Sequence, residues 1–326
     1  MQLAMVGLGR MGASMARRLV ARGHDVVVYD VDPARAEAEA EGGATPATSL
    51  EDVVAKLEAP RAVWVMVPSG EPTRTTLAKL AAVLESGDTV VDGGNSNYHD
   101  SKRVWEDLAQ QGIQFIDAGV SGGVWGEKDG YCLMVGGDED AVRRLEPAFV
   151  DLATPGGYAH VGPAGAGHYT KMVHNGIEYG LLQAYAEGFA LLEAATELDL
   201  DLHQLAALWN HGSVVRSWLL ELAESALGSP EEFASVQGYV EDSGEGRWTV
   251  EEAVNRAVPA PVITASLFER FSSRDDERFA ARIIAALRNQ FGGHRMHTAA
   301  PGDGAPSDSA PSEGSSDAAG SPDAGS

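Results

Sequence analysis

The stretch that decides the fold lies near the start of the sequence and reads Leu3-Ala4-Met5-Val6-Gly7-Leu8-Gly9-Arg10-Met11-Gly12. The apolar residues 3–6 predict a buried strand, the glycines predict a tight turn, and a helical pattern follows to about Ala21. Residues 26–29 predict a second strand, which ends at Asp30. A glycine-rich turn between a strand and a helix, with an acid after the next strand, is typical of a dinucleotide-binding unit.

Each glycine of this turn has a physical role in binding a nucleotide. Gly7 permits the turn, Gly9 lets the backbone approach a pyrophosphate, and Gly12 lets the helix pack on the strand. The phosphates then meet the amides at the helix N-terminus. The alternative interpretation is a plain glycine turn in a parallel sheet.

Asp30 indicates which dinucleotide is bound. Its carboxylate can accept hydrogen bonds from the adenine ribose hydroxyls, and its charge repels a 2′-phosphate, so we expect NAD rather than NADP. Arg10 and Arg35 lie nearby in the sequence and could weaken that repulsion. The expected cofactor-binding residues are Gly7, Gly9, Arg10, Met11, Gly12, Asp30, Val67 and Asn95.

The first half of the chain continues to alternate strands and helices. Further strands are predicted at residues 62–67, 89–92, 114–117 and 131–135. The alternation predicts an α/β fold with a doubly wound, mainly parallel Rossmann-type sheet covered by helices on both faces. The loops that follow three of these strands should line one binding crevice, because parallel strands end at the same edge. These loops are residues 67–70, 92–96 and 120–123.

The pattern changes near Pro163 to an almost entirely helical one. Residues 169–197 predict one long helix, in which Gly176, Gly180 and Gly188 are expected to mark close packing. We therefore expect a dinucleotide-binding domain over residues 1–162 and an all-α substrate and oligomerisation domain over residues 163–298. Residues 299–326 contain only Ala, Gly, Ser, Pro, Asp and Glu, and are expected to form a disordered acidic tail.

The composition excludes several classes of function. The chain of 326 residues has 48 acidic and 24 basic side chains, a net charge of -24, so we expect no nucleic acid and no anionic membrane as partner. The single cysteine, Cys132, excludes a disulfide framework and is expected to pack in the sheet. The sequence has no basic patch near its start and no bilayer-spanning apolar run, so we expect a cytoplasmic protein.

The basic residues are mostly arginine. Of the 24 basic side chains, 5 are lysines and 24 − 5 = 19 are arginines. A large acidic excess with little lysine keeps a surface hydrated at molar salt, where screening suppresses self-repulsion. We expect a protein from a salt-adapted, halophilic cytoplasm; an ordinary acidic bacterial enzyme is the alternative.

The stretch most informative for chemistry is Lys171-Met172-Val173-His174-Asn175-Gly176-Ile177-Glu178-Tyr179. At helical spacing, four polar side chains share one face of a helix: Lys171, His174, Asn175 and Glu178. An exposed ladder of ion pairs is one interpretation. The apolar flanks favour burial instead: Met172, Val173, Ile177, Leu181 and Leu182. A lysine desolvated in a cleft binds its proton less tightly and can act as a general base.

Together these motifs resemble 6-phosphogluconate dehydrogenase (decarboxylating) in its short form. The matching stretches span most of residues 1–298: residues 7–12, 92–96, 120–123, 171–179, 243–249 and 288–294. The block 171–179 is highly specific, whereas many dehydrogenases share the glycine motif. A lysine that some longer members use for phosphate is replaced here by Ser243.

The resemblance implies a reaction, a step of the pentose phosphate pathway and of gluconate use. The lysine matching Lys171 removes the proton of the carbon 3 hydroxyl of 6-phospho-D-gluconate while hydride passes to the nicotinamide. The 3-keto acid then loses carbon dioxide. The acid matching Glu178 protonates carbon 1 of the enediol to give D-ribulose 5-phosphate. The resemblance implies no metal.

The resemblance also implies a substrate site. The sugar acid should contact Asn95, Ser121, Gly122, Gly123, His174, Asn175 and Tyr179. The phosphate should contact Arg270, with Arg288 and His294 contributed by a neighbouring subunit of a homodimer or homotetramer. His168, His203, His211 and His297 are assigned no role.

Two alternative functions remain open. Another β-hydroxyacid dehydrogenase, such as 3-hydroxyisobutyrate dehydrogenase, would share the glycine loop and the lysine, but not the His174, Asn175 and Glu178 set together with the phosphate-binding side chains. A silent NAD-sensing or scaffold protein would have no need of both Lys171 and Glu178.

Overall fold

A computed structural model describes residues 1–275 and 278–292 of the protein. The chain divides into two compact units, residues 1–274 and residues 275–326. The second unit contributes one described helix, α14 (Phe279–Gly292). The expected acidic tail at residues 299–326 lies outside the described residues. The first unit contains both the sheet and the helices α8 to α13, so the domain boundary expected after residue 162 stays a prediction.

The first unit begins with an eight-stranded sheet in the order β3-β2-β1-β4-β5-β6-β7-β8. Strand β7 pairs antiparallel with β6, and the other pairings among the described strands are parallel. The mainly parallel doubly wound sheet is therefore confirmed. The strands are β1 (Gln2–Val6), β2 (Asp25–Tyr29), β3 (Thr45–Pro46), β4 (Ala62–Val65), β5 (Thr89–Asp92), β6 (Gln114–Ser121), β7 (Tyr131–Gly137) and β8 (Ala153–Gly162).

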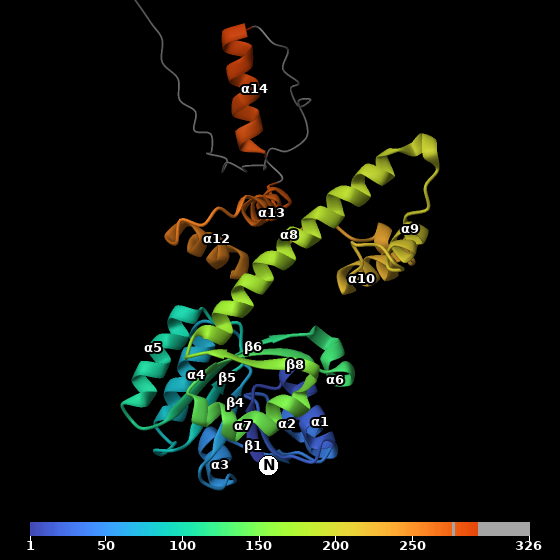
Figure 1. The fold of residues 1–326 in the computed structure, drawn as a ribbon. Helices are drawn as coiled ribbons and strands as arrows, with labels where there is room; N and C mark the ends of the chain where they lie inside the picture. Colours follow the sequence, from blue (N-terminus) through green and yellow to red (C-terminus); the bar gives the residue numbers. More distant parts are fainter. Residues whose placement is uncertain (276–277, 293–326) are drawn as a thin grey trace, which may run out of the picture. The chain divides into compact units, whose positions relative to one another are not determined.

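Helices cover both faces of this sheet (Figure 1). Successive side chains of β4 point to opposite faces, so Val63 belongs to one apolar core and Trp64 to the other. Both faces are buried at β1 and β4, which explains why these two strands are almost entirely apolar instead of alternating. The covering helices are α1 (Arg10–Ala21), α2 (Pro33–Glu41), α3 (Leu50–Ala55), α4 (Glu71–Ala81), α5 (Tyr98–Ala109) and α7 (Glu139–Leu152). The short helix α6 (Gly126–Asp129) contacts α1.

The long helix α8 (Ala166–Ala194) is the element that connects the sheet with the later helices. It was expected at residues 169–197, so it begins and ends three residues earlier than the sequence pattern predicts. The following helices are α9 (Leu202–Trp209), α10 (Trp218–Leu227), α11 (Pro230–Ala234), α12 (Glu245–Asn255) and α13 (Pro261–Ser272).

Strand β6 fixes where α8 starts. The buried Asp117 carboxylate accepts hydrogen bonds from the backbone N–H of Gly165, at 2.6 Å, and of His168, at 2.7 Å. A carboxylate at a helix N-terminus satisfies amides that have no intrahelical partner and interacts favourably with the helix dipole. A Cβ at Gly167 would lie 2.3 Å from the Asp117 carbonyl oxygen, so glycine is what allows α8 to lie directly on the strand.

Two of the three glycines within α8 mark close helix contacts, as expected. A Cβ at Gly176 would lie 2.6 Å from Thr249 Cγ2 of α12, and one at Gly180 would lie 3.2 Å from Val262 Cγ1 of α13. The expectation for Gly188 is wrong within the described chain, because a Cβ there would meet nothing within 4 Å.

Several local predictions need correction. Strands β3 and β8 were not predicted, because β3 has only two residues and most of β8 is exposed or half-buried, with no apolar alternation. Strand β4 ends at Val65, and β6 continues through Ser121, so residues expected in a loop belong to a strand. Cys132 lies in β7 but its side chain is exposed, since the buried Tyr131 and Leu133 on either side face the core. Among the described residues, no helix is both long and apolar enough to cross a membrane.

Candidate active site

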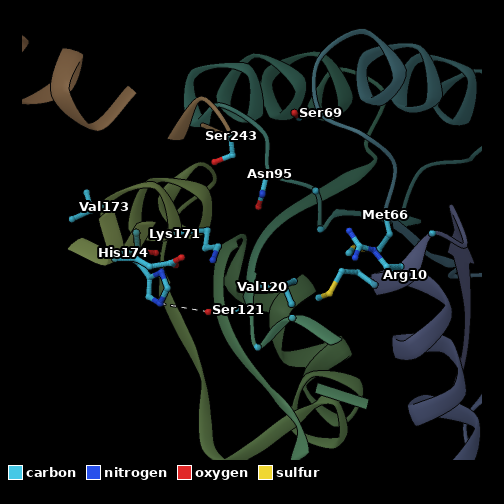
Figure 2. Close-up of a pocket in the computed structure, with 18 of the residues that line it drawn as sticks. Arg10, Met66, Ser69, Asn95, Val120, Ser121, Lys171, Val173, His174 and Ser243 are labelled. Carbon is cyan, nitrogen blue, oxygen red and sulfur yellow. Dashed lines mark hydrogen bonds between the residues drawn. The ribbon is translucent and has the colours of Figure 1, made fainter. Parts of the chain in front are cut away.

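A cleft of about 1220 Å³ opens where the parallel strands end (Figure 2). The glycine turn after β1 lines it, together with residues 66–69 after β4, residues 93–95 after β5 and residues 120–123 at the end of β6. One face of α8 and three residues of α10, Trp218, Leu219 and Leu222, complete the wall with Ser243. The three loops predicted to share one edge of the sheet therefore do meet around one cavity.

The glycine turn has the geometry that its sequence predicts. Gly7 has φ +94°, in the region that favours glycine, and a Cβ at Gly12 would lie 1.9 Å from the Gly7 carbonyl oxygen. A Cβ at Gly9 would meet nothing within 4 Å, and no side chain caps α1 at this residue. The amides of the first helical turn are thus open to a phosphate. Gly9, Arg10, Met11 and Gly12 line the cleft, whereas Gly7 shapes the turn from behind.

Asp30 lies outside the cleft lining and holds the glycine turn. Its carboxylate accepts hydrogen bonds from Leu8 N at 2.6 Å and from Asp32 N at 2.9 Å. Arg35 Nη1 lies 3.8 Å from the same carboxylate. Each carboxylate oxygen has two lone pairs, so these two bonds leave capacity for a ligand hydroxyl. Sequence reasoning missed the tether to Leu8. Of the other expected cofactor residues, Val67 and Asn95 line the cleft.

Three of the four polar residues expected on one face of α8 line the cleft, namely Lys171, His174 and Glu178, and Figure 2 shows Lys171 and His174 there; Asn175 is not among the lining residues. Lys171 and Asn175 are buried, while His174 and Glu178 are half-buried. His174 Nε2 lies 3.5 Å from Ser121 Oγ, and its Nδ1 lies 3.0 Å from Asn175 Oδ1. The sugar-acid residues expected from β6 and α8 are thus neighbours.

The burial of this face does not come from the apolar flanks alone. Met172 is buried, but Ile177 and Leu181 have exposed side chains that line the cleft. The stem of Lys171 instead packs on β6, where a Cβ at Gly119 would lie 2.4 Å from Lys171 Cβ.

Lys171 is the group whose ionisation the site changes most clearly. Burial lowers the pKa of its ammonium, and the negative charges of Glu245 and Glu178 oppose that effect. Among the described residues, no carboxylate lies within ion-pair distance of its amine. An amine with a lowered pKa and no fixed partner is suited to accept a proton from a bound hydroxyl.

Arg270, on α13, is not among the residues that line the cleft. Its guanidinium carbon is 3.4 Å from the centroid of the Tyr179 ring, and its Nη1 donates a hydrogen bond to the Glu241 carbonyl oxygen at 3.0 Å. The Tyr179 hydroxyl accepts a hydrogen bond from Ser243 N at 3.2 Å, and Ser243 lines the cleft. Arg270 and Tyr179 are thus brought together at the end of the cleft that Ser243 marks.

The remaining expected residues are placed less fully. Gly122 and Gly123 line the cleft beside Ser121. Arg288 is an exposed residue of α14, which belongs to the other unit. His294 lies outside the described residues.

Sequence reasoning missed one buried acid of the site, Glu245, which is 2 % exposed at the first position of α12. An acid at a helix start is usually an exposed partner of the helix dipole, so its position alone predicts no role. Glu245 lies within residues 243–249, one of the stretches that resemble the family, and this resemblance is the sequence signal that could have identified it.

Comparison with known proteins agrees with this geometry. The NAD-binding domain of 6-phosphogluconate dehydrogenase matches residues 2–162, and the C-terminal domain of 6-phosphogluconate dehydrogenase matches residues 167–301. The chain belongs to the 6-phosphogluconate dehydrogenase family. The family match therefore covers both the sheet with its glycine turn and the helix α8, which carries Lys171.

Relatives of known name cover nearly the whole chain. YqeC of Bacillus subtilis is 42 % identical over 294 residues, which are 90 % of this chain and 98 % of that protein. The NAD(+)-dependent, decarboxylating 6-phosphogluconate dehydrogenase of Haloferax volcanii is 45 % identical over 298 residues, 91 % of this chain and 98 % of that enzyme. The NADP(+)-dependent, decarboxylating 6-phosphogluconate dehydrogenase of Bacillus subtilis is 36 % identical over 296 residues. These residues are 86 % of this chain and 63 % of that enzyme.

Solved structures of two kinds of dehydrogenase share this fold. The 6-phosphogluconate dehydrogenase of Plasmodium falciparum has a TM-score of 0.78 at 25 % identity, over 93 % of this chain and 67 % of that one. The 3-hydroxyisobutyrate dehydrogenase of Mycobacterium tuberculosis has a TM-score of 0.69 at 27 % identity, over 84 % of this chain and 94 % of that one.

Proposed function

We propose that the protein catalyses the oxidative decarboxylation of 6-phospho-D-gluconate to D-ribulose 5-phosphate and carbon dioxide, with NAD as the oxidant. The observation that carries this proposal is the buried amine of Lys171, with its lowered pKa, on the same cleft-facing side of α8 as Glu178. Membership of the family and two relatives that share nearly the full length support the same reaction.

The cofactor site fits a nicotinamide dinucleotide. Gly9, Arg10, Met11 and Gly12 would hold it at the N-terminus of α1, whose uncapped amides suit a pyrophosphate. The coenzyme, when bound, supplies the acceptor for the hydride of carbon 3. The fold also positions Val67 and Asn95 on the same cavity, where they can contact the ring.

Lys171 and Glu178 divide the proton transfers between them. Lys171 Nζ accepts the proton of the carbon 3 hydroxyl as that carbon is oxidised. The resulting ammonium then stabilises the negative charge that develops on the carbon 3 oxygen when carbon dioxide leaves. Glu178 donates a proton to carbon 1 of the enediol. The two groups lie two helical turns apart on α8, so one substrate can contact both.

The substrate is oriented by the side chains around these two groups. Ser121 and His174 line the cleft and present a hydroxyl and an imidazole to the sugar acid, while the buried Asn175 holds the His174 ring through its Oδ1. Tyr179 and Arg270 bind the phosphate at the Ser243 end, where a guanidinium suits a phosphate group. Arg288 and His294 complete that site from a neighbouring subunit.

The preference for NAD rests on charge. Asp30 and Asp32 place two carboxylates after β2, with Arg35 as a nearby cation. Their net charge disfavours the 2′-phosphate of NADP. Family members of both coenzyme types exist, so this preference is tested by comparing kcat/KM for NAD and for NADP.

An oligomer is part of the same proposal. Several apolar side chains on the long helix and on α12 and α13 are more than half exposed: Leu191 (74 %), Val254 (74 %), Val262 (65 %) and Phe268 (57 %). Such a surface is typical of a protein interface. We expect a homodimer or homotetramer, which analytical ultracentrifugation distinguishes from a monomer.

The decisive assay mixes protein, 6-phosphogluconate and NAD and follows absorbance at the NADH band together with carbon dioxide release. Both signals should rise together. The structural likeness to 3-hydroxyisobutyrate dehydrogenase favours a simple β-hydroxyacid oxidation as the second candidate. In that case coenzyme reduction without carbon dioxide, or turnover of 3-hydroxyisobutyrate in place of the phosphorylated acid, would be observed.

A further inference from the structure

Glu245 is held against α8 by a close contact between two helices. Thr249 Oγ1, one turn further along α12, donates a hydrogen bond to the Met172 carbonyl oxygen at 2.9 Å. A Cβ at Gly246 would lie 2.4 Å from the Tyr179 ring. These contacts fix the start of α12 beside the part of α8 that carries the polar cleft face, and Glu245 is only 2 % exposed there.

The carboxylate of Glu245 is buried without a direct partner among the described residues. Within residues 1–275 and 278–292 it makes no side-chain hydrogen bond and no ion pair. Glu252, two turns further along α12, is also buried, but its carboxylate is compensated. It accepts a hydrogen bond from Tyr98 at 3.0 Å and pairs with Arg256. Burial of an unpaired carboxylate is costly, so a fold that keeps one needs a reason.

The groups that interact electrostatically with Glu245 belong to α8. They are Lys171, His168 and Glu178. His168 is 1 % exposed; its Nδ1 lies 2.7 Å from Ser101 Oγ, while its Nε2 is buried without a hydrogen-bond partner in the described chain. Cys132 of β7 also interacts electrostatically with Lys171.

The other charges near the start of α12 already have partners. Asp242, in the segment before α12, pairs with Arg247 at 2.8 Å and with Arg274 at 2.9 Å. Arg270 of α13 is stacked on Tyr179. The unpartnered buried carboxylate and the unpartnered buried amine of this site are therefore Glu245 and Lys171.

Burial acts on these two groups in opposite senses. It raises the pKa of the Glu245 carboxyl and lowers the pKa of the Lys171 ammonium. Both shifts favour the uncharged forms of the two side chains. The attraction between the Glu245 carboxylate and the Lys171 ammonium favours the charged forms instead. Burial and mutual attraction therefore act in opposite directions on the charges of these two groups.

We propose that Glu245 is a positioning residue that acts through Lys171, stabilising the ammonium that forms when Lys171 takes the proton of the substrate hydroxyl. The O–H bond of the substrate breaks and an N–H bond of Lys171 forms, while Glu245 contributes its charge and makes no bond. The assignment rests on the proposed function for the identity of that substrate, but not for the electrostatic interaction between the two side chains.

The test compares Glu245→Gln, which removes the charge at nearly constant shape, with Glu245→Asp, which keeps it. Glu251→Gln is the matched control, because Glu251 is an exposed residue of the same helix. The first measurement is the rate at which trinitrobenzenesulfonate modifies Lys171 as a function of pH, followed by peptide mass spectrometry. This readout needs neither substrate nor turnover, so it stands even where the proposed function fails.

In Glu245→Gln the pH midpoint for modification of Lys171 should fall by about one unit, because the ammonium loses its counter-charge. Glu245→Asp and Glu251→Gln should keep the wild-type midpoint. In turnover, the acid limb of kcat/KM for 6-phosphogluconate should move to lower pH in Glu245→Gln, and kcat should fall about tenfold with KM little changed. Where Glu245→Gln does not fold, Glu245→Thr removes the same charge with a smaller side chain.

A wild-type midpoint for Lys171 in Glu245→Gln, or an equal shift in Glu251→Gln, would overturn the proposal. Lower activity with an unmoved acid limb would show a purely structural role and would overturn it as well. Wild-type protein that shows the expected Lys171 midpoints but no turnover of 6-phosphogluconate would instead contradict the proposed function alone.

Discussion

Lys171 lies directly on Gly119, so that a Cβ at residue 119 would be 2.4 Å from the Cβ of the lysine. Glycine in β6 is therefore what lets Lys171, the general base that we propose, approach the sheet. We expect Gly119→Ala to push α8 outward and to lower kcat/KM about 100-fold, because a displacement of about 1 Å at a reacting group has that effect. Steady-state kinetics with both substrates checks it.

Gly188→Ala is the matched control for this displacement. Gly188 lies in the same helix, and a Cβ there would meet nothing within 4 Å in the described chain. Alanine should leave kcat unchanged and stabilise the helix by about 1 kcal/mol. Wild-type kinetics in Gly119→Ala would show that the position of the amine is not set by this contact.

Lys171→Met should abolish oxidation and at the same time stabilise the fold. Because burial lowers the pKa of Lys171, the unfolded chain binds this proton more readily than the folded protein does. The site therefore destabilises the fold at neutral pH, and this cost disappears only as the pH rises through the ordinary value of 10.5. Removing the amine should raise Tm at pH 7 by about 2–4 °C.

The measurements are coenzyme reduction and calorimetry at pH 7 and at pH 10, where the difference in Tm should shrink. Near-normal turnover in Lys171→Met would contradict the assignment of the base. A lower Tm at pH 7 would contradict the burial of a destabilising charge.

The sequence predicted the sheet because its signals are local. An apolar run of four residues such as β4, followed by Pro68 and Gly70, indicates a buried strand without knowledge of its neighbours. The same holds for the polar face of α8, which follows from helical spacing alone. Strand β8 was missed because its residues are largely exposed and include Gly156 and Gly157, so no apolar pattern marks it.

The features that the sequence could not predict depend on contacts between distant segments. The sequence predicts Asp117 at the end of a strand, yet its carboxylate accepts hydrogen bonds from Gly165 N and His168 N and so caps α8. Asp30 reads as a ligand for ribose, yet it also fixes Leu8 of the glycine turn. Glu245 is buried only because Gly246 and Gly176 allow two helices to approach. Such roles follow from packing, and no spacing in the sequence encodes them.

Glu178→Gln should separate oxidation from product formation. Glutamine cannot supply the proton that carbon 1 of the enediol requires, whereas the Lys171 step stays intact. We expect a rapid burst of NADH equal to the number of sites, followed by turnover slowed about 100-fold. Stopped-flow absorbance detects the burst, and tritium uptake from solvent into ribulose 5-phosphate reports the protonation step. Loss of the burst itself would assign Glu178 to oxidation instead.

Asp30→Asn tests the coenzyme preference. The amide loses the charge that disfavours a 2′-phosphate, so the ratio of kcat/KM for NADP to that for NAD should rise about tenfold. The bond from Leu8 N can be kept by the amide oxygen, which limits damage to the glycine turn. Asp25→Asn, at the exposed start of the same strand, changes the same charge and should leave the ratio unchanged. An unchanged ratio in Asp30→Asn would remove Asp30 as the determinant.

Salt should stabilise the protein. The chain carries a net charge of -24, and at about 0.1 M salt the screening length is about 10 Å, so surface carboxylates repel one another over several neighbours. At about 1 M the length falls to about 3 Å, and this repulsion is lost. Exposed ion pairs such as that of Arg143 with Glu139 are screened as well, but each contributes less than about 1 kcal/mol. We therefore expect Tm to rise by several degrees between 0.1 M and 3 M KCl, a range that calorimetry can follow. Sucrose at matched osmolality is the control for exclusion effects, and a Tm that falls in concentrated KCl would identify an ordinary acidic enzyme.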